Sequence, residues 1–351
     1  MHEGRFGRFS MNPLVSILIP AYNAEDWIAD TLRSAIEQTW SQKEIIVVDD
    51  GSTDRTLAVA RQFESRGVRI VTQENQGAAA ARNKAFSLCK GDYIQWLDAD
   101  DLLAPDKIAR QVETLQSCRS KRTLLSAEWG AFMHRYHRAK FVPTELWCDL
   151  TPAEFLRRKM RYNQHMQTAT WLTSRELTEA AGPWDTTLSS DDDGEYYCRV
   201  LLACDSVRFV KSSRVYYRSV GTNRLSYLGA SDKKLSAMWK SMQLHIGYAR
   251  SLQDTPEVRA ACVTYMQNWL INFYPERLDI VKQAEELARG LGGELQTPSL
   301  VWKYAWIRML FGWSLAKRAK LLMPSIRWAL VRSFDKALFQ IESLYRHPTL
   351  N

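Results

Sequence analysis

Residues 44–54 read E-I-I-V-V-D-D-G-S-T-D, an apolar run that ends in two acids and a turn. Such an unbroken β-branched run is typical of a strand that is buried on both faces of a parallel sheet. Ser52 and Asp54 can each cap a helix, which predicts a helix over about 54–63. The stretch therefore predicts a strand–helix unit with polar side chains where the strand ends.

The same unit recurs on both sides of this stretch. Short apolar runs lie at 15–19, 68–72 and 93–97, and a helical pattern follows each of them. This alternation predicts an α/β fold with a Rossmann-like, mostly parallel sheet that is flanked by helices. Further strands are expected at 168–172, 207–210 and 215–218, and further helices at 78–88, 233–250, 256–272 and 280–291.

The change of pattern along the chain predicts its domain organisation. Residues 1–12 are a polar lead-in, 13–228 form the α/β domain, and 229–351 form a helical C-terminal extension. Within the α/β domain, 13–118 alternate strand and helix, whereas 119–228 are mixed. The ordinary proportions of hydrophobic (46%) and charged (25%) residues exclude a wholly disordered chain and a fibre.

The net charge of +8 is concentrated in a tail, residues 298–351, which holds nine Lys and Arg against two Asp and Glu. The rest of the chain therefore carries only +1. Tryptophans lie among these cations, a composition that suits an anionic membrane surface. Two interpretations of the amphipathic pattern over 330–345 stay open, namely packing on the protein's own core and membrane binding. Nucleic acid is not an expected partner, because the chain has no recognisable motif that reads it.

Cysteine usage and hydropathy predict a cytoplasmic protein. The six cysteines are spread widely and none has C-x-x-C spacing, which fits a reducing compartment. No apolar run reaches the length of a membrane-spanning helix, and the run at 14–19 is too short for a signal peptide. Together with the basic tail, these features predict a cytoplasmic location on the inner face of the cell membrane.

A polar cluster follows each of the four N-terminal strands. The clusters are P-A-Y-N at 20–23, D-D-G-S at 49–52, E-N-Q-G at 74–77 with Arg82 after it, and D-A-D-D at 98–101. Ligands bind beyond the carboxyl ends of parallel strands, so these side chains are expected to meet. Clustered carboxylates repel one another, and hard oxygen ligands select Mg²⁺ or Mn²⁺ to offset them. The alternative for any single cluster is a helix cap or a solvated turn.

A fifth acidic cluster, D-D-D-G-E, occupies residues 191–195. Repulsion among four carboxylates should raise the pKa of at least one of them, which would suit a general base at neutral pH. The alternative is an acidic first turn of a helix, which the helix dipole favours. Both interpretations can hold together, because a base at a helix start is well positioned.

These motifs, taken together, resemble family 2 glycosyltransferases of the bacterial cell-envelope and polysaccharide type. The resemblance over about 14–118 rests on V-S-I-L-I-P-A-Y-N, I-I-V-V-D-D-G-S-T-D, N-Q-G-A-A-A-A-R-N and D-Y-I-Q-W-L-D-A-D-D. Residues 182–199, G-P-W-D-T-T-L-S-S-D-D-D-G-E-Y-Y-C-R, are similar to the family's acceptor-side segment. The resemblance implies a GT-A fold, with a nucleotide-sugar half at 13–118 and an acceptor half at 119–228. It also implies inverting, metal-assisted transfer from a nucleoside-diphosphate sugar, with a UDP-sugar as the expected donor, to a hydroxyl of a glycan or lipid-linked acceptor.

The resemblance also implies a role for individual positions. Asp193 matches the general base, Asp100 the ligand of Mn²⁺ or Mg²⁺, and the remaining positions bind the donor or shape the acceptor site. The expected donor contacts are Pro20, Tyr22 and Asp50 near the base, Asp98 at the ribose and Arg82 at the phosphates, and the acceptor-side residues are Trp184, Asp185 and Asp192.

Three positions depart from the family pattern. Asp192 stands where glutamate is usual, and Glu195 stands where aspartate is usual. Ser219 replaces a frequent histidine that can contact the metal or the diphosphate, a contact that Arg224 or water is expected to supply.

Two other functions are alternatives to glycosyl transfer. A nucleotidyltransferase also places acidic metal ligands on an α/β sheet, but P-A-Y-N stands where its lysine-bearing, glycine-rich loop would follow the first strand. A non-catalytic adaptor that binds nucleotide sugar or membrane would not need both the metal-binding and the base acids. The interpretation requires Asp50, Asp100 and Asp193 to line one cleft.

Overall fold

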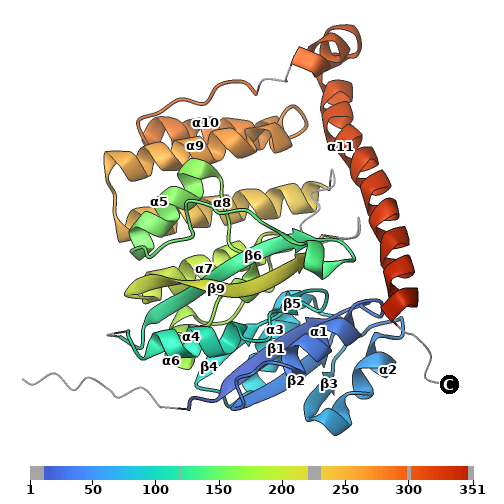
Figure 1. Cartoon of the computed structure of the whole chain (residues 1–351). Coiled ribbons are helices and arrows are strands. Elements are labelled where there is room, and N and C mark those ends of the chain that lie inside the picture. Colours follow the sequence, from blue (N-terminus) through green and yellow to red (C-terminus); the bar gives the residue numbers. More distant parts are fainter. Residues whose placement is uncertain (1–11, 119, 220–230, 299–301, 347–351) are drawn as a thin grey trace, which may run out of the picture.

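A computed structural model describes residues 12–118, 120–219, 231–298 and 302–346 of the chain. An α/β domain forms one end of the molecule, helices are stacked on it, and a long C-terminal helix runs along one side (Figure 1). The predicted order of an α/β domain followed by helices is therefore present. The limits proposed for the individual domains remain predictions.

The first sheet has the order β3-β2-β1-β4-β8. Its first four strands are parallel: β1 (Val15–Ala21), β2 (Lys43–Asp49), β3 (Val68–Thr72) and β4 (Tyr93–Trp96). The short β8 (Thr173–Ser174) pairs antiparallel with β4 at the edge. The predicted parallel sheet is confirmed, and the carboxyl ends of its parallel strands lie at one edge.

Helices cover both faces of this sheet, as the alternating pattern predicts. Ile17 and Ile19 of β1 pack with α1 (Ile28–Ile36), whereas Leu18 packs with α3 (Ala78–Leu88) on the opposite face. The buried side of α3 carries alanines, whose small side chains let the helix lie close to β1 and β2. Two further helices belong to this part of the chain: α2 (Thr56–Arg61), between β2 and β3, and α4 (Lys107–Leu115), which packs on β9.

The second sheet has the order β5-β9-β6-β7 and differs from the sequence prediction. The two strands expected at 207–210 and 215–218 are one strand, β9 (Ser206–Arg218). It pairs with β6 (Thr123–Phe132), and the register shifts where Ser212 adopts a positive φ of 65°. An irregularity of this kind interrupts the alternation of side chains, which is why one strand reads as two. The sheet is completed by β5 (Leu102–Leu103) and β7 (Lys140–Phe141).

The strand expected at 168–172 is wrong. Residues Thr168–Thr170 form a 3-10 helix. After it, Leu172 makes an isolated antiparallel bridge with Leu125, and Thr173 and Ser174 pair as β8. The side chain of Gln167 accepts a hydrogen bond of 2.6 Å from the backbone N–H of Ala169, which closes the turn. Side-chain to backbone bonds of this kind compete with a strand ladder, so the apolar pattern alone was misleading.

The helical extension is not a separate body. Helices α8 (Asp232–Leu252), α9 (Pro256–Phe273) and α10 (Leu278–Gly290) lie close to their predicted bounds. They share one hydrophobic core with α3 and with three helices of the α/β domain: α5 (Pro152–Tyr162), α6 (Arg175–Ala181) and α7 (Asp192–Ala203). Helix α7 packs against both α6 and α8. The extension therefore supports the acid segment at the start of α7.

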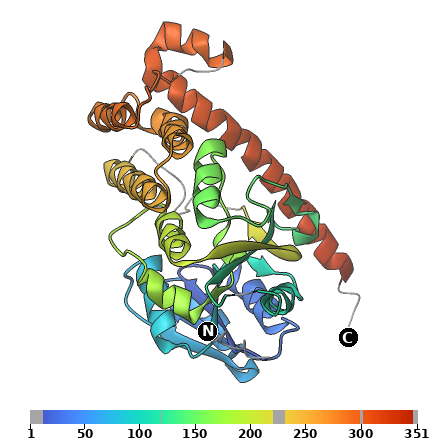
Figure 2. The ribbon, with the colours of Figure 1, turned by 90° about the vertical axis from the view of Figure 1, so that its left-hand side faces the viewer.

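The C-terminal helix α11 (Trp302–Arg346) bends at Gly312, whose φ of 81° is outside the helical range. Beyond the bend it runs along the side of the molecule (Figure 2). Arg135, on the segment after β6, forms ion pairs with Asp335 at 2.8 Å and Glu342 at 2.9 Å of this helix. Within the described parts of the chain, no helix is both long enough and apolar enough to cross a bilayer.

Candidate active site

The acidic turn at 98–101 follows β4 at the carboxyl edge of the first sheet. Asp98 and Asp100 are partly exposed, whereas Asp101 is buried. Asp101 accepts hydrogen bonds from the Gln167 side chain and, at 2.8 Å, from the backbone N–H of Arg218. The third acid of the cluster therefore holds the turn in place, and the first two are the ones that can meet a ligand.

Arg82, on α3, joins this turn to the fifth acidic cluster. Its guanidinium lies 2.8 Å from a carboxylate oxygen of Asp98 and 2.8 Å from one of Asp192. The residue is only 5% exposed. Burial opposes its charge, but Asp98, Asp192 and Asp193 together outweigh burial and raise the pKa of Arg82 above its usual value. Acids from the donor-side and acceptor-side motifs therefore converge on one cation.

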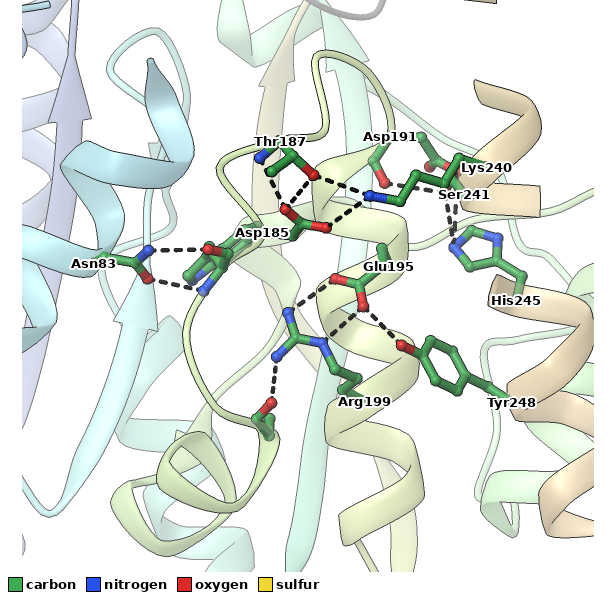
Figure 3. A network of polar contacts seen from close by, with 12 residues as sticks. Asn83, Asp185, Thr187, Asp191, Glu195, Arg199, Lys240, Ser241, His245 and Tyr248 are labelled. Carbon is green, nitrogen blue, oxygen red and sulfur yellow. Dashed lines mark hydrogen bonds and ion pairs between the residues drawn. The ribbon is translucent and has the colours of Figure 1, made fainter. Parts of the chain in front are cut away.

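The Trp184 side chain supports this cation from below. Its ring lies 4.3 Å from the Arg82 guanidinium carbon and stacks on Tyr196, with ring centroids 4.0 Å apart. Asn83 donates to the Trp184 carbonyl at 2.9 Å and accepts from its backbone N–H at 2.8 Å (Figure 3). Trp184 is 2% exposed and holds Arg82 from within the core, and its expected role in shaping the acceptor site stays a prediction.

The three acids that could act as the base differ in their partners. Asp192 is paired with Arg82, and Glu195 is 3% exposed and paired with Arg199 through both oxygens, at 2.7 and 2.8 Å. Asp193 is partly exposed and accepts a weaker bond of 3.3 Å from the Thr168 hydroxyl, besides one of 2.9 Å from the N–H of Gly194. Asp192 and Glu195 are thus each paired with an arginine, whereas these two bonds to Asp193 come from neutral groups.

The expected rise in pKa within this cluster occurs at Asp192. Burial raises the pKa of Asp192 to about 6; Arg82 opposes the rise, and Asp193 and Asp98 add to it. Burial also raises the pKa of Asp191. The main cause is therefore loss of hydration rather than the repulsion between neighbouring acids that the sequence indicated.

The residues expected near the nucleotide base lie where β1 and β2 end. Pro20 is buried in β1, and Tyr22, directly after the strand, is 50% exposed. Asp50 is 2% exposed and accepts hydrogen bonds from the Gln73 side chain at 2.7 Å and from the N–H groups of Gln76 at 3.0 Å and Gly77 at 2.8 Å. Asp50 thus fixes the turn that leads into α3, and through α3 the position of Arg82.

Asp185 lies at the edge of the acceptor-side segment and is partly exposed. It accepts hydrogen bonds from the backbone N–H of Thr187 at 2.8 Å and from the Thr187 hydroxyl at 2.6 Å. Its other oxygen is 3.5 Å from the Lys240 ammonium group of α8. This expected site residue is therefore held by a turn and by the helical extension.

Sequence analysis missed Arg218, the last residue of β9. It is 2% exposed, donates to the Asp100 carbonyl at 2.8 Å, and lies between the rings of Trp27 at 4.5 Å and Phe132 at 4.6 Å. An arginine at the end of a strand gives no signal of such a role, because its partners come from three distant segments. Ser219, the departure noted next to it, is exposed, and Arg224 lies outside the described residues.

A divalent metal fits this site only if the donor supplies part of its coordination. Within the described residues, no group of three His, Cys, Asp or Glu side chains could hold an ion. Asp98 and Asp100 offer carboxylate oxygens, which suit Mg²⁺ and Mn²⁺, and these ions usually keep water or phosphate oxygens as further ligands. The donor set is therefore compatible with an ion that is shared with a diphosphate.

The double pairing of Arg82 predicts a large effect on stability. Replacing Arg82 with Gln leaves two poorly hydrated carboxylates without their cation, which should lower the free energy of unfolding by about 3 kcal/mol. The matched control is Arg110→Gln, because Arg110 and Asp106 form an exposed pair on α4, and its loss should cost less than about 1 kcal/mol. Urea unfolding of both variants measures the difference, and equal losses would contradict the prediction.

Comparison with known proteins agrees with this geometry. Residues 16–160 match the sequence model of Glycosyl transferase family 2. The putative teichuronic acid biosynthesis glycosyltransferase TuaG of Bacillus subtilis is 44% identical over 111 residues, which cover 30% of this chain and 44% of TuaG. Chondroitin synthase of Escherichia coli is 45% identical over 98 residues, 27% of this chain and 14% of that protein. These matches span less than half the length of either relative.

Solved structures extend the likeness of fold beyond the sequence match. TarS 1-349 of S. aureus superposes with a TM-score of 0.61 at 17% identity, covering 79% of this chain and 80% of the TarS chain. TarS has also been solved in complex with UDP and with UDP-GlcNAc. The predicted GT-A fold is confirmed. Over residues 16–160, the chain is therefore similar to glycosyl transferase family 2.

Proposed function

We propose that this protein is an inverting glycosyltransferase that moves a sugar from a nucleoside-diphosphate sugar to a hydroxyl group of its acceptor. The observation that carries the proposal is the double ion pair of Arg82 with Asp98 and Asp192. It brings the acids of the donor-side turn and those at the start of α7 to one place, as transfer between two substrates requires. The match of residues 16–160 to glycosyl transferase family 2 supports the reaction class, and the UDP-GlcNAc complex of TarS supports a UDP-sugar donor.

On the donor side, each proposed contact follows a strand end. Tyr22 would lie against the nucleotide base, since its exposed ring offers a flat apolar surface. Asp50, whose carboxylate already organises the turn before α3, would lie at the rim of the base pocket with Pro20 behind it. Asp98 would face the ribose, and Arg82 would add positive charge near the phosphates.

A Mn²⁺ or Mg²⁺ ion would be held by Asp100, with Asp98 beside it and diphosphate oxygens as further ligands. When bound, such an ion neutralises negative charge on the departing diphosphate. The protein's own part is to hold the acids for it. Arg218 holds the Asp100 carbonyl and Asp101 holds the rest of the turn, so the carboxylates keep their positions while the ligand changes.

In the proposed chemical step, Asp193 takes the proton of the acceptor hydroxyl. The acceptor oxygen forms a bond to the anomeric carbon on the face opposite the nucleotide, while the bond from that carbon to the diphosphate oxygen breaks with its electron pair. The products are a glycoside of inverted configuration, a nucleoside diphosphate and protonated Asp193. Thr168 orients the base through its hydroxyl, and Asp192 stays paired with Arg82.

The acceptor side of the proposal includes an anionic membrane surface, which suits a lipid-linked or cell-envelope glycan. Tyr304, Ala316 and Lys317 of α11 are buried, so part of the tail packs on the protein. On both sides of Ala316 and Lys317 along α11, Arg308, Arg318, Arg332 and Lys336 lie among exposed apolar side chains. Those side chains are Trp306, Met309, Leu310, Phe311, Leu315, Trp328, Leu330, Val331, Phe334, Phe339 and Ile341. Cations among exposed aromatic and aliphatic groups match acidic lipid.

Replacing Asp193 with Asn should abolish turnover and leave donor affinity within about twofold, because the amide cannot accept the proton but fills the same volume. Release of nucleoside diphosphate from a panel of nucleotide sugars measures turnover, and calorimetry measures donor binding. Asp149→Asn, an exposed acid paired with Arg208, is the control that keeps full activity. Near-normal transfer by the Asp193 variant would show that another group is the base, and release of pyrophosphate would indicate a nucleotidyltransferase.

Replacing Asp100 with Ala should weaken donor binding at least tenfold in the presence of Mn²⁺ and change it little in the presence of EDTA, because only the metal-dependent part is lost. Calorimetry under both conditions measures this difference. Asp106→Ala, next to the turn and exposed, serves as the control. If the Asp100 variant binds the donor with unchanged affinity in Mn²⁺, Asp100 does not hold the metal.

Replacing Phe311 and Phe334 together with Glu should release the protein from vesicles of equimolar phosphatidylglycerol and phosphatidylcholine, because charge is added to the apolar face that would enter the headgroup layer. Cosedimentation measures binding. The control is Val142→Glu, an exposed apolar residue directly after β7 and outside α11. Equal sedimentation of wild type and double variant would refute the membrane proposal, as would equal binding of the wild type to pure phosphatidylcholine.

A further inference from the structure

We propose that Ser241 of α8 is a positioning residue that holds Asp191 and thereby sets the place of Asp193 at the start of α7. The helical extension would then complete the active site, although it lies outside the family match, which ends at residue 160. The inference rests on the proposed function, because it concerns the acid that is proposed as the base.

Asp191, directly before α7, has an unusual backbone conformation. Its φ of 56° and ψ of 33° lie in the left-handed region, which a residue with a side chain enters at a cost. Asp is among the few residues that tolerate this region. The conformation turns the chain sharply into α7, and the carbonyl of Asp191 accepts the N–H of Glu195 at 3.2 Å, the first turn of the helix. Interactions outside this turn are needed to stabilise it.

Ser241 supplies such an interaction from α8. Its hydroxyl donates to the Asp191 carboxylate at 2.8 Å, and the residue has no exposed surface. A second helix fixes the hydroxyl, because Ser241 lies 3.3 Å from Nε2 of His245, whose Nδ1 lies 3.1 Å from the Tyr265 hydroxyl of α9. Figure 3 shows Ser241 and His245 beside the Asp191 carboxylate, and Tyr265 of α9 extends this chain of buried polar groups.

Gly194 shows how closely these groups pack. A Cβ atom at Gly194 would overlap the Asp191 carboxylate and would lie 3.1 Å from Cε1 of His245. The carboxylate and the imidazole thus occupy the space beside the first turn of α7. This explains why a glycine, which is unfavourable inside helices, stands next to Asp193.

Two further residues of α8, Tyr248 and Lys240, hold the flanks of the segment. Tyr248 donates to Glu195 at 2.9 Å on one side of Asp193, and Lys240 contacts the Thr187 hydroxyl at 3.0 Å on the other (Figure 3). Residues 241, 245 and 248 are three or four positions apart, so one face of α8 presents them together. Asp193 lies between the two held flanks, so the backbone that carries it is held on both sides.

The consequence for catalysis is geometric. A general base must lie within hydrogen-bond reach of the proton that it takes, and a misplacement of about 1 Å can cost a hundredfold in rate. Loss of the Ser241 contact should therefore lower turnover without changing the donor contacts, which come from α3, β1, β2 and the 98–101 turn. A split between kcat and donor affinity distinguishes this role from a general loss of structure.

The first test compares Ser241→Ala with Ser251→Ala, a control on the same helix whose exposed hydroxyl contacts only its own helix in the described structure. Ser241→Ala should lower kcat about tenfold with a donor dissociation constant within twofold of wild type, whereas Ser251→Ala should match wild type. Turnover within twofold of wild type in Ser241→Ala would overturn the proposal, as would a parallel loss of donor affinity.

The second test uses a conservative rescue at Asp191. Asn keeps both the acceptor oxygen and the tolerance for a positive φ, whereas Ala keeps neither. Asp191→Asn should therefore retain most of the turnover that Asp191→Ala loses, with thermal melting used to check that both variants fold. Equal losses in the two variants would show that the charge of Asp191 matters rather than its place in the turn.

Hydrogen exchange separates failure of this inference from failure of the proposed function. The amides of 191–197 should exchange faster in Ser241→Ala than in wild type or Ser251→Ala, whatever reaction the protein catalyses. If exchange is unchanged, Ser241 does not hold the segment. If exchange increases while the wild type releases no nucleoside diphosphate from any donor, the positioning contact stands and the proposed function fails.

Discussion

A single buried guanidinium lies between two carboxylates, one in the turn after β4 and one at the start of α7. Arg82 is buried with its charge balanced by Asp98 and Asp192, each 2.8 Å away, and a buried charge without such partners would be costly. Because all three groups gain from being together and lose when separated, the positions of α3, the end of β4 and the start of α7 depend on one another. The donor-side and acceptor-side motifs are thereby parts of one site.

The surroundings of Arg82 reinforce this dependence. Asp50 holds the turn before α3, Trp184 lies under the guanidinium, and Asn83 binds the backbone on which Trp184 stands. The Trp184 ring, which faces the guanidinium, in turn stacks on Tyr196 of α7. Asp50 and Trp184 thus help to build the scaffold that places the charged groups. The family resemblance had implied a donor contact for Asp50 and an acceptor-side position for Trp184.

The helical extension has two relations to this scaffold. Helices α8 to α10 share its hydrophobic core and support α7, so they belong to the same structural unit as the acid segment. Helix α11 contacts the segment after α9 through Trp313 and Lys317. Its distal part contacts the segment after β6 through Asp335, Phe339 and Glu342. Over the part of α11 with the amphipathic pattern, Leu330, Val331, Phe334, Phe339 and Ile341 are exposed, and membrane binding there stays a proposal.

The sequence by itself determined the parallel strands, the helices between them and the acids at the strand ends, because hydrophobic period, capping residues and turns are local properties. It even gave the bounds of α3 to the residue. The sequence prediction was wrong at β9, because a change of register within this one strand made its pattern resemble two strands. It was also wrong at 168–172, because the Gln167 side chain stabilises a turn there. Only the tertiary structure decided that Asp98 and Asp192 share Arg82. It also decided that Asp101 and Glu195 are hydrogen-bonded to Gln167 and Arg199. The contacts of Arg218 with the Asp100 carbonyl and of Ser241 with Asp191 likewise depend on it. Those contacts join residues far apart in the chain, and whether a carboxylate is paired, buried or free to act depends on which neighbours the fold brings to it.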